Sequence, residues 1–201
     1  MLKLYYVPGT CALCPHIVLH ETGLGFTLDK VDPRSKQTES GQDYNAINPK
    51  GYVPALVMNN GQLLTEVAVI VQYLADLVPN KKLAPPPGTI DHYHLLEILN
   101  FVATEIHKSY SPLFNPKYSV EAKTIAREHL ALRLGVAAKA LEGKDYLMGN
   151  DYSIADAYLF TVLRWSPRVG VDLAQWPALK DYMDRIAARP AVKAAMKEQG
   201  L

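Results

Sequence analysis

The sequence has few cysteines, no excess of either charge and no long apolar run. Only two of its 201 residues are cysteines, and a reducing cytoplasm keeps such thiols reduced unless they cycle catalytically. Its 21 lysines and arginines balance 20 aspartates and glutamates, so no strong field attracts nucleic acid or an acidic membrane surface. No apolar stretch approaches the roughly 18 residues of a membrane span, and the N-terminus lacks a secretory signal pattern. We therefore expect a cytoplasmic protein with neither nucleic-acid nor membrane partners.

The composition, at 49% hydrophobic residues, supports a substantial core, and its N-terminal part alternates strand and helix signals. The expected elements are a strand Leu2–Tyr6, a helix ending near Gly23, a strand Phe26–Val31, an irregular segment at 44–47, strands Ala55–Met58 and Gln62–Leu64, and a helix Val67–Leu77. Thr65 is the expected N-cap of the last helix, with Glu66 at its positive end. This order of elements predicts a thioredoxin-like domain over residues 1–78.

Residues 79–88 are rich in proline and glycine, which predicts a linker. Residues 89–201 show helical periodicity and no strand signal, so an all-α domain is expected there. Its predicted helices run from residue 90 to before Pro112 and over 119–141, 157–165, 177–188 and 190–199. Ser153 and Asp156 have the spacing of a capping box, which assigns Asp156 to folding rather than to catalysis.

The turn after the first strand holds both cysteines, in a C-x-x-C pair. Cys11 lies at or just before a helix N-terminus, where the helix dipole favours an anion and hence a nucleophilic thiolate. Zinc ligation by the pair would need two more ligands at matching spacing, so a thioredoxin-like redox motif is the better interpretation. For Cys14 two interpretations stay open, a resolving redox thiol and a small buried hydrophobic residue.

His16 and His20 stand four residues apart and would share one face of the first helix. No H-E-x-x-H carboxylate separates them and no third ligand is evident in the sequence. We expect packed or surface histidines and no metal site.

Several motifs in fixed order extend over essentially the whole chain. They are Tyr6-x-Pro8-Gly9-x-Cys11-x-Leu13, Asn48-Pro49-Lys50-Gly51-x-Val53-Pro54-Ala55-Leu56, Leu64-Thr65-Glu66 with Ile70-x-Gln72-Tyr73-Leu74, Asn100-Phe101-x-x-x-Glu105-x-His107-Lys108, and Ser153-Ile154-Ala155-Asp156-Ala157-Tyr158. In this order they resemble the cytosolic glutathione transferases, specifically the bacterial beta class. The resemblance implies a homodimer with the glutathione transferase fold, in which the thioredoxin-like domain binds glutathione and the helical domain binds a small hydrophobic electrophile.

The resemblance also implies glutathione-binding residues. Pro54 matches a cis-proline that lets the Val53 backbone pair with the cysteinyl part of glutathione. Glu66 matches the residue that holds the γ-glutamyl end, and Lys36 matches a basic residue near the glycyl carboxylate, although a solvated loop lysine is the alternative. A serine or glycine usually follows this glutamate, whereas Val67 offers only its backbone N–H, which removes one contact to glutathione.

The resemblance implies that Cys11 and His107 are the catalytic residues, with His107 accepting the thiol proton. Asn100 matches a position that contacts glutathione from a neighbouring subunit. Tyr6 stands before the turn and is assigned to packing. Residues that could line the hydrophobic pocket, or belong to the core, are Tyr110, Phe114, Arg164 and Trp165.

Three functions follow from these residues. The first is conjugation of glutathione, as a co-substrate and without other cofactor, to hydrophobic electrophiles in detoxification or catabolism. The second is a glutathione-dependent thiol–disulfide oxidoreductase that uses Cys11 and Cys14. The third, which Val67 alone supports, is a non-catalytic protein that binds glutathione or another ligand.

Overall fold

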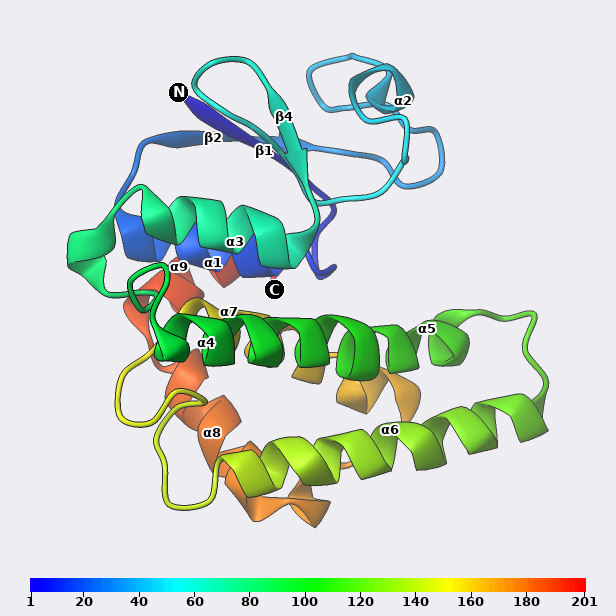
Figure 1. Ribbon diagram of the computed structural model, residues 1–201. Coiled ribbons are helices and arrows are strands. Elements are labelled where there is room, and N and C mark those ends of the chain that lie inside the picture. Colours follow the sequence, from blue (N-terminus) through cyan, green and yellow to red (C-terminus); the bar gives the residue numbers. More distant parts are fainter. The chain divides into compact units, whose positions relative to one another are not determined.

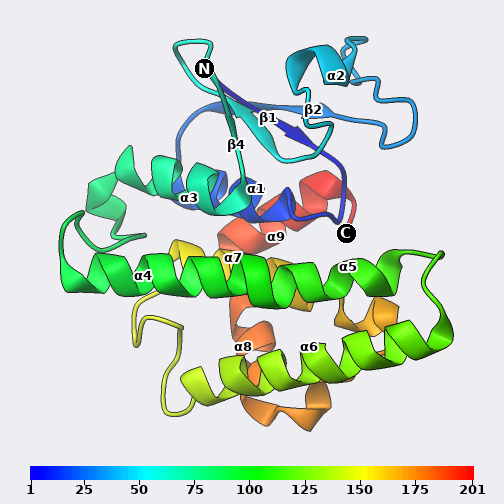
Figure 2. The same ribbon diagram turned by 45° about the vertical axis from the view of Figure 1, so that its right-hand side comes forward.

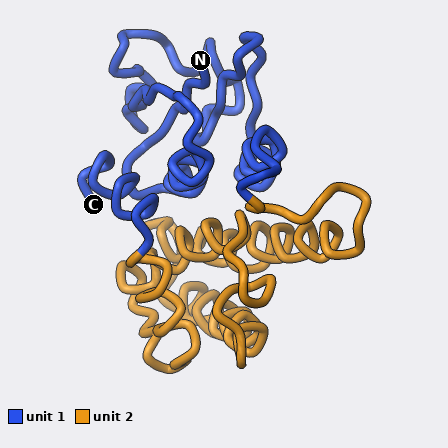
Figure 3. Tube along the Cα trace, turned by 90° about the vertical axis from the view of Figure 1, so that its left-hand side faces the viewer, with its two compact units in different colours: residues 1–81, 189–201 blue, residues 82–188 orange.

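The computed structural model describes residues 1–201, which form two compact units (Figure 3). Unit 1 comprises residues 1–81 and 189–201, and unit 2 comprises residues 82–188. No helix is both long and apolar enough to cross a membrane.

Unit 1 contains a four-stranded sheet in the order β2-β1-β3-β4 (Figure 1). Its strands are β1 (Leu2–Tyr6), β2 (Phe26–Lys30), β3 (Ala55–Val57) and β4 (Leu63–Thr65). The β1–β2 pair is parallel, and the β1–β3 and β3–β4 pairs are antiparallel. Helices α1 (Leu13–Thr22), α3 (Val67–Asp76) and α9 (Pro190–Gln199) lie on one face of the sheet (Figures 1 and 2). The predicted thioredoxin-like order is confirmed.

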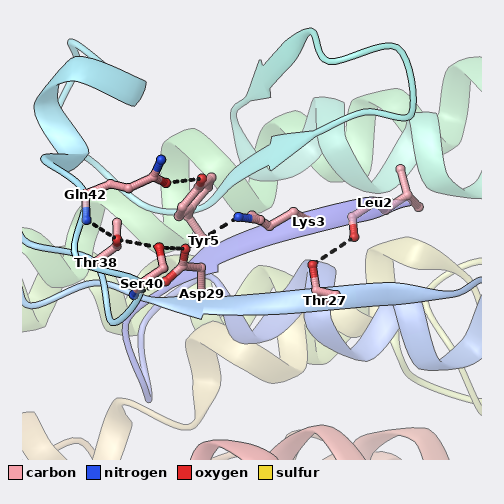
Figure 4. Close-up of polar contacts among 8 residues, drawn as sticks. All are labelled: Leu2, Lys3, Tyr5, Thr27, Asp29, Thr38, Ser40 and Gln42. Carbon is pink, nitrogen blue, oxygen red and sulfur yellow. Dashed lines mark hydrogen bonds and ion pairs between the residues drawn. The ribbon is translucent and has the colours of Figure 1, made fainter.

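The opposite face of the sheet is covered by a short helix and an anchored loop. The helix α2 (Tyr44–Ile47) forms where an irregular segment was expected, because Asp43 caps it and Tyr44 packs on Tyr5 in a buried cluster. The loop that follows β2 is anchored where Ser40 Oγ donates to Asp29 Oδ2 at 2.6 Å (Figure 4). Lys36 belongs to this loop, so these contacts fix its backbone.

The prediction that Thr65 caps α3 is wrong. Thr65 pairs with Ala55 in the β3–β4 ladder, so its backbone is extended, and Glu66 is the N-cap. Pro54 directly precedes Ala55 and Glu66 directly follows Thr65, so both lie at the same end of this antiparallel ladder. The sheet register therefore brings together two predicted site residues.

Residues 189–201, which were predicted to belong to the helical domain, belong to unit 1 instead. The α9 helix packs on α1, and Arg189 forms a two-bond ion pair with Glu21, with nitrogen–oxygen distances of 2.7 and 3.1 Å. Gln199 bonds both His16 and the backbone of Gly9. The helical pattern was predicted correctly, but a periodicity does not indicate against which element a helix packs.

Unit 2 is all-helical. Its elements are α4 (Ile90–Phe101), a π-helical segment (Val102–His107), α5 (Lys108–Phe114), α6 (Val120–Ala140), α7 (Ile154–Leu163) and α8 (Pro177–Ala187), with short 3-10 turns at Ser166–Val169 and Leu173–Gln175. The first three form one continuous rod, with α6 beside it (Figures 1 and 2). The predicted linker holds a short 3-10 turn, Pro79–Lys81.

Pro112 lies inside α5, so the expected end of that helix before the proline is wrong. Proline removes one helix hydrogen bond, but Tyr110 and Leu113 on either side of it are buried, and their burial keeps the last turn helical.

The capping box at α7 is present, as predicted. Every residue of α7 is buried, and Asp156 accepts hydrogen bonds from the Leu147 and Ser153 backbone N–H groups and from the Tyr182 hydroxyl. Four donors, counting the Ser153 hydroxyl, thus converge on one carboxylate in the core of unit 2. These contacts agree with the structural role assigned to Asp156.

Candidate active site

The cysteine turn is the short segment that joins β1 to α1. Thr10 Oγ1 donates to the Val7 carbonyl at 2.7 Å, and the Leu13 N–H donates to the Thr10 carbonyl at 3.1 Å. Cys11 is half-buried in this turn, directly before the N-cap residue Ala12, and no side chain caps α1. The positive end of the helix therefore faces the region of the Cys11 thiol, which favours a thiolate there.

Cys11 also contacts a residue 42 positions away. Its thiol donates to the Val53 carbonyl oxygen at 3.4 Å, and the peptide bond between Val53 and Pro54 is cis. This contact places the Cys11 sulfur beside the segment that the sequence predicted to pair with glutathione. Val53, Pro54 and Cys11 thus form one site within unit 1.

Two lysines and one glutamate lie on the loops of the same unit. Lys36 has a positive φ of 58°, and its Nζ donates to the Gly51 carbonyl at 2.9 Å, next to the Val53 segment. Lys50 Nζ lies 3.0 Å from Glu66 Oε1 and 2.9 Å from Thr65 Oγ1. The sequence analysis missed Lys50, although it lies inside the Asn-Pro-Lys-Gly motif, because a motif match alone does not indicate that its lysine pairs with Glu66.

The start of α3 has an unusual backbone. Glu66 has φ 72° and ψ 123°, a conformation that residues with a Cβ rarely adopt, and its side chain does not cap the helix. Val67 follows with its side chain buried. An uncapped helix N-terminus presents backbone N–H groups that suit a carboxylate, and a strained residue beside it is typical of ligand sites.

Cys14 is completely buried on the inner side of α1. Burial, and secondly the nearby Cys11, raises the pKa of the Cys14 thiol well above its usual value. A thiol that is buried and protonated is a poor nucleophile. Of the two interpretations left open by the sequence, the geometry favours packing.

A hydrogen-bond network ties the cysteine turn to α9. The Gly9 N–H donates to Gln199 Oε1 at 3.1 Å, which turns the amide Nε2 toward His16 Nδ1, also at 3.1 Å. The proton of a neutral His16 therefore sits on Nε2 and is donated to Glu198 Oε2 at 2.7 Å. Burial lowers the pKa of His16, which favours this neutral form. His20 Nε2 lies 3.2 Å from the same Glu198 oxygen.

The ligand atoms of His16, His20 and Glu198 lie within 4.8 Å of one another, so these three residues could hold a metal ion by distance. The sequence analysis missed Glu198 because it is 182 residues from His16. A metal would need the His16 Nε2 lone pair, whereas the Gln199 contact assigns a proton to that nitrogen. The donor pattern therefore fits a hydrogen-bond network better than a metal site, and the predicted absence of a metal stays a prediction.

In unit 2, His107 ends the π-helical segment beside a cluster of aromatic rings. Its Nδ1 lies 2.8 Å from the Tyr158 hydroxyl, and its ring contacts Trp165 at 5.0 Å between centroids. Trp165 in turn makes edge contacts with Tyr110 at 5.5 Å and Phe114 at 5.8 Å. The last three, Tyr110, Phe114 and Trp165, are called the aromatic cluster below.

The remaining predicted residues are placed within the same two units. Asn100 is exposed on α4, where its Nδ2 donates to the Leu96 carbonyl at 2.9 Å. Tyr6 is buried, and burial, followed by the charges of Glu39 and Glu198, raises its pKa, which agrees with packing. Unit 1 contains Cys11, Lys36, Val53, Pro54, Glu66 and Val67, and unit 2 carries Asn100 and His107 on one helical rod.

A thioredoxin-like unit with a cysteine turn and a cis-proline, followed in the chain by an all-helical unit, defines the glutathione transferase fold. The family models "Glutathione S-transferase, N-terminal domain" and "Glutathione S-transferase, C-terminal domain" match residues 10–77 and 101–190. Glutathione S-transferase GstA of Escherichia coli O157:H7 is 46% identical over 200 residues, covering 100% of both chains. The chain therefore belongs to the glutathione S-transferase family and is a transferase enzyme.

Solved structures support the bacterial beta class. A Sphingomonas chungbukensis beta-class glutathione S-transferase is 44% identical, covers 99% of each chain and has a TM-score of 0.95. A sphingomonad glutathione S-transferase complexed with glutathione is 47% identical over 99% of each chain, with a TM-score of 0.96. The fold and class predicted from the sequence are thus confirmed.

Proposed function

We propose that this transferase joins the thiol of glutathione to small hydrophobic electrophiles, in detoxification or catabolism. The observation that carries the proposal is the 3.4 Å contact between Cys11 Sγ and the Val53 carbonyl beside cis-Pro54. Because of this contact, the Cys11 sulfur lies next to backbone groups of Val53 that can pair with a peptide. The glutathione complex of the sphingomonad relative supports the same ligand.

Glutathione is proposed to bind unit 1 as an added strand. The Val53 N–H and carbonyl pair with its cysteinyl backbone, and the peptide N–H then replaces the Cys11 thiol as donor to that carbonyl. The γ-glutamyl group offers its ammonium to Glu66 and its carboxylate to the N–H of Val67 at the start of α3. Lys36, held on the Gly51 carbonyl, is positioned for the glycyl carboxylate.

The chemistry is a substitution at the electrophile. The glutathione thiol loses its proton, the sulfur forms a bond to the electrophilic carbon, and the leaving group departs with the bonding electrons of the broken bond. The proposal assigns Cys11 and His107 to the activation of this thiol, as the family resemblance implies. The Tyr158 hydroxyl on Nδ1 supports a fixed orientation of the His107 ring.

The second candidate, a disulfide oxidoreductase with Cys14 as resolving thiol, requires attack by Cys14. Its complete burial and raised pKa argue against that step. A non-catalytic binding protein is the third candidate, and it rests on the absence of a hydroxyl at Val67. The Lys50–Glu66 pair and the uncapped start of α3, in the same unit as Cys11, favour a working site over this candidate.

The proposal extends to a cytoplasmic homodimer in which Asn100 reaches the partner's glutathione. The exposure of Asn100 on α4, and of several apolar residues on α4 and α6, supports it. Analytical ultracentrifugation tests the dimer. A monomer at micromolar concentration would contradict this part of the proposal and leave the chemistry in unit 1 unaffected.

The function itself is tested with wild type, Cys11→Ala, Cys14→Ala and His107→Gln. Each is assayed for conjugation of glutathione to a generic aryl halide and for reduction of a mixed glutathione disulfide. We expect conjugation to fall in His107→Gln and to be retained in Cys14→Ala, with disulfide reduction slower than conjugation and dependent on Cys11. Faster disulfide reduction that is lost in Cys14→Ala would instead establish the oxidoreductase, and glutathione binding without either reaction would establish the binding protein.

A further inference from the structure

Two arginines flank the aromatic cluster of unit 2. Arg164 is the C-cap of α7, directly before Trp165, and Arg168 lies in the 3-10 turn that follows. The guanidinium carbon of Arg168 lies over the Phe114 ring, 5.8 Å from its centroid. The positive charge of Arg168 is therefore held at the edge of these rings, and Arg164 is joined to Trp165 in the chain.

Neither charge is balanced by a carboxylate. Three other arginines form ion pairs, namely Arg133 with Glu105 at 2.9 Å, Arg185 with Asp145 at 3.4 Å and Arg189 with Glu21 at 2.7 Å. Arg127 donates from Nε to the Val169 carbonyl at 3.0 Å instead. Arg164 and Arg168 form no ion pair, although Arg164 is half-buried.

The electrostatic environment of Arg164 disfavours its charge. Burial, and secondly the like charge of Arg168, lowers the pKa of the Arg164 guanidinium. A partly desolvated cation next to a second cation is stabilised when an anion binds between them or beside them. No carboxylate of the chain pairs with Arg164 or Arg168, so an anionic ligand can supply the missing negative charge.

The rings next to these arginines can accept an aromatic ligand. Phe114 is 44% exposed, while Trp165 and Tyr110 are buried behind it and hold its ring in edge and stacked contacts. The Tyr110 hydroxyl is 2.6 Å from Ser166 Oγ, so its ring is fixed in place. A flat ring that packs on Phe114 would carry its substituents toward the guanidinium of Arg168.

We propose that unit 2 selects aromatic electrophiles that carry a carboxylate or sulfonate, with the ring on Phe114 and the anion on Arg164 and Arg168. This inference rests on the proposed function and adds the substrate class to it. In the reaction the glutathione sulfur displaces chloride from the aryl carbon, the thiol proton leaves to base or solvent, and the anionic substituent takes no part in bond making.

The test compares two chlorinated electrophiles that differ in charge, neutral 1-chloro-2,4-dinitrobenzene and anionic 4-chloro-3,5-dinitrobenzoate. For each, kcat/KM is divided by the uncatalysed rate constant with glutathione, and the ratio of the anionic to the neutral value is followed. Variants Arg164→Gln and Arg168→Gln are compared with Arg185→Gln, an arginine that pairs with Asp145 instead. Circular dichroism verifies that each variant is folded.

We expect the ratio to fall about tenfold in each of the first two variants, mainly through KM of the anionic electrophile, and to stay unchanged in Arg185→Gln. The wild-type ratio should also fall as salt is raised. A ratio within twofold of wild type in both arginine variants overturns the inference. If wild type accelerates neither reaction, the proposed function fails. Fluorescence titration with the unreactive compounds 3,5-dinitrobenzoate and 1,3-dinitrobenzene then tests the inference separately. Equal affinities for these two compounds overturn the inference.

Discussion

The backbone strain at Glu66 gives a prediction in which two variants differ in stability but lose the same glutathione affinity. The residue has φ 72° and ψ 123°, and a side chain held in such a region costs about 1–3 kcal/mol. Glu66→Gly removes that cost but adds about 0.4–1 kcal/mol of unfolded-state entropy. Loss of the exposed pair with Lys50 removes at most about 1 kcal/mol. The net expectation is a free energy of unfolding about 1 kcal/mol higher than that of Glu66→Ala, which keeps the Cβ and the strain.

Glutathione affinity should change in the same way in both variants. Each loses the carboxylate that is proposed to bind the γ-glutamyl ammonium, and a charge-assisted hydrogen bond contributes about 1.5–3 kcal/mol. The dissociation constant should therefore rise roughly 10- to 100-fold in Glu66→Gly and in Glu66→Ala alike. Urea unfolding measures the first quantity, and isothermal titration calorimetry with glutathione measures the second.

The comparison between the two variants decides the reasoning. Since both lose the carboxylate and the Lys50 pair, the difference in their unfolding free energies isolates the backbone term. Equal unfolding free energies for the glycine and alanine variants would refute the strain argument. Unchanged glutathione affinity in both would refute the placement of Glu66 in the site.

Three further predictions concern buried groups. A disulfide-exchange reagent should label Cys11 rapidly in the native protein and Cys14 only after unfolding, because Cys14 is completely buried. Because burial lowers the pKa of His16 below its ordinary value of 6.5, the folded protein binds fewer protons than the unfolded chain. The contribution of His16 to the free energy of unfolding is complete above pH 6.5. It is lost as the pH falls from 6.5 toward the folded pKa, by up to about 1.4 kcal/mol per pH unit. The His16→Gln variant should lack this pH-dependent contribution. Asp156→Ala should lower the free energy of unfolding by about 4 kcal/mol, since the Leu147 and Ser153 N–H groups are left buried without an acceptor.

Each of these predictions has a matched control. Cys14→Ala should leave the fast labelling phase unchanged, and a second fast thiol in native wild type would contradict the burial argument. The exposed His129→Gln variant should keep the pH dependence that His16→Gln loses, and identical profiles for the two would contradict it. The exposed Asp151→Ala variant should change stability by less than about 0.5 kcal/mol, and kcat of folded Asp156→Ala should match wild type if Asp156 is structural.

Most of the fold could be predicted because its signals are local. Leu2–Tyr6 and Pro190–Gln199 form with the boundaries that apolar runs and breaking residues indicate. The errors came from long-range contacts. Thr65 was expected to cap α3, but pairing with Ala55 keeps it extended, and α9 was assigned to the wrong domain because only its packing on α1 determines its place.

The candidate site was predicted as a set of residues but not as a geometry. Motif spacing identified Cys11, Val53 and Glu66, yet the Cys11–Val53 contact depends on the folded sheet. The pair between Lys50 and Glu66 escaped the sequence analysis for the same reason, because nothing in a motif gives the distance between two side chains. The burial of Cys14 is likewise a property of packing and could only be left open.

The return of the chain to unit 1 has a consequence for its synthesis. A ribosome releases residues 1–81 first, but the Gly9 N–H finds its partner on Gln199 only after the whole of residues 82–188 has been made. The segment that carries the thiol therefore emerges before unit 2 and gains its last described hydrogen bond after it. A nascent chain interrupted anywhere in unit 2 lacks this hydrogen bond, so the cysteine turn is fully anchored only in molecules whose translation has passed the helical unit.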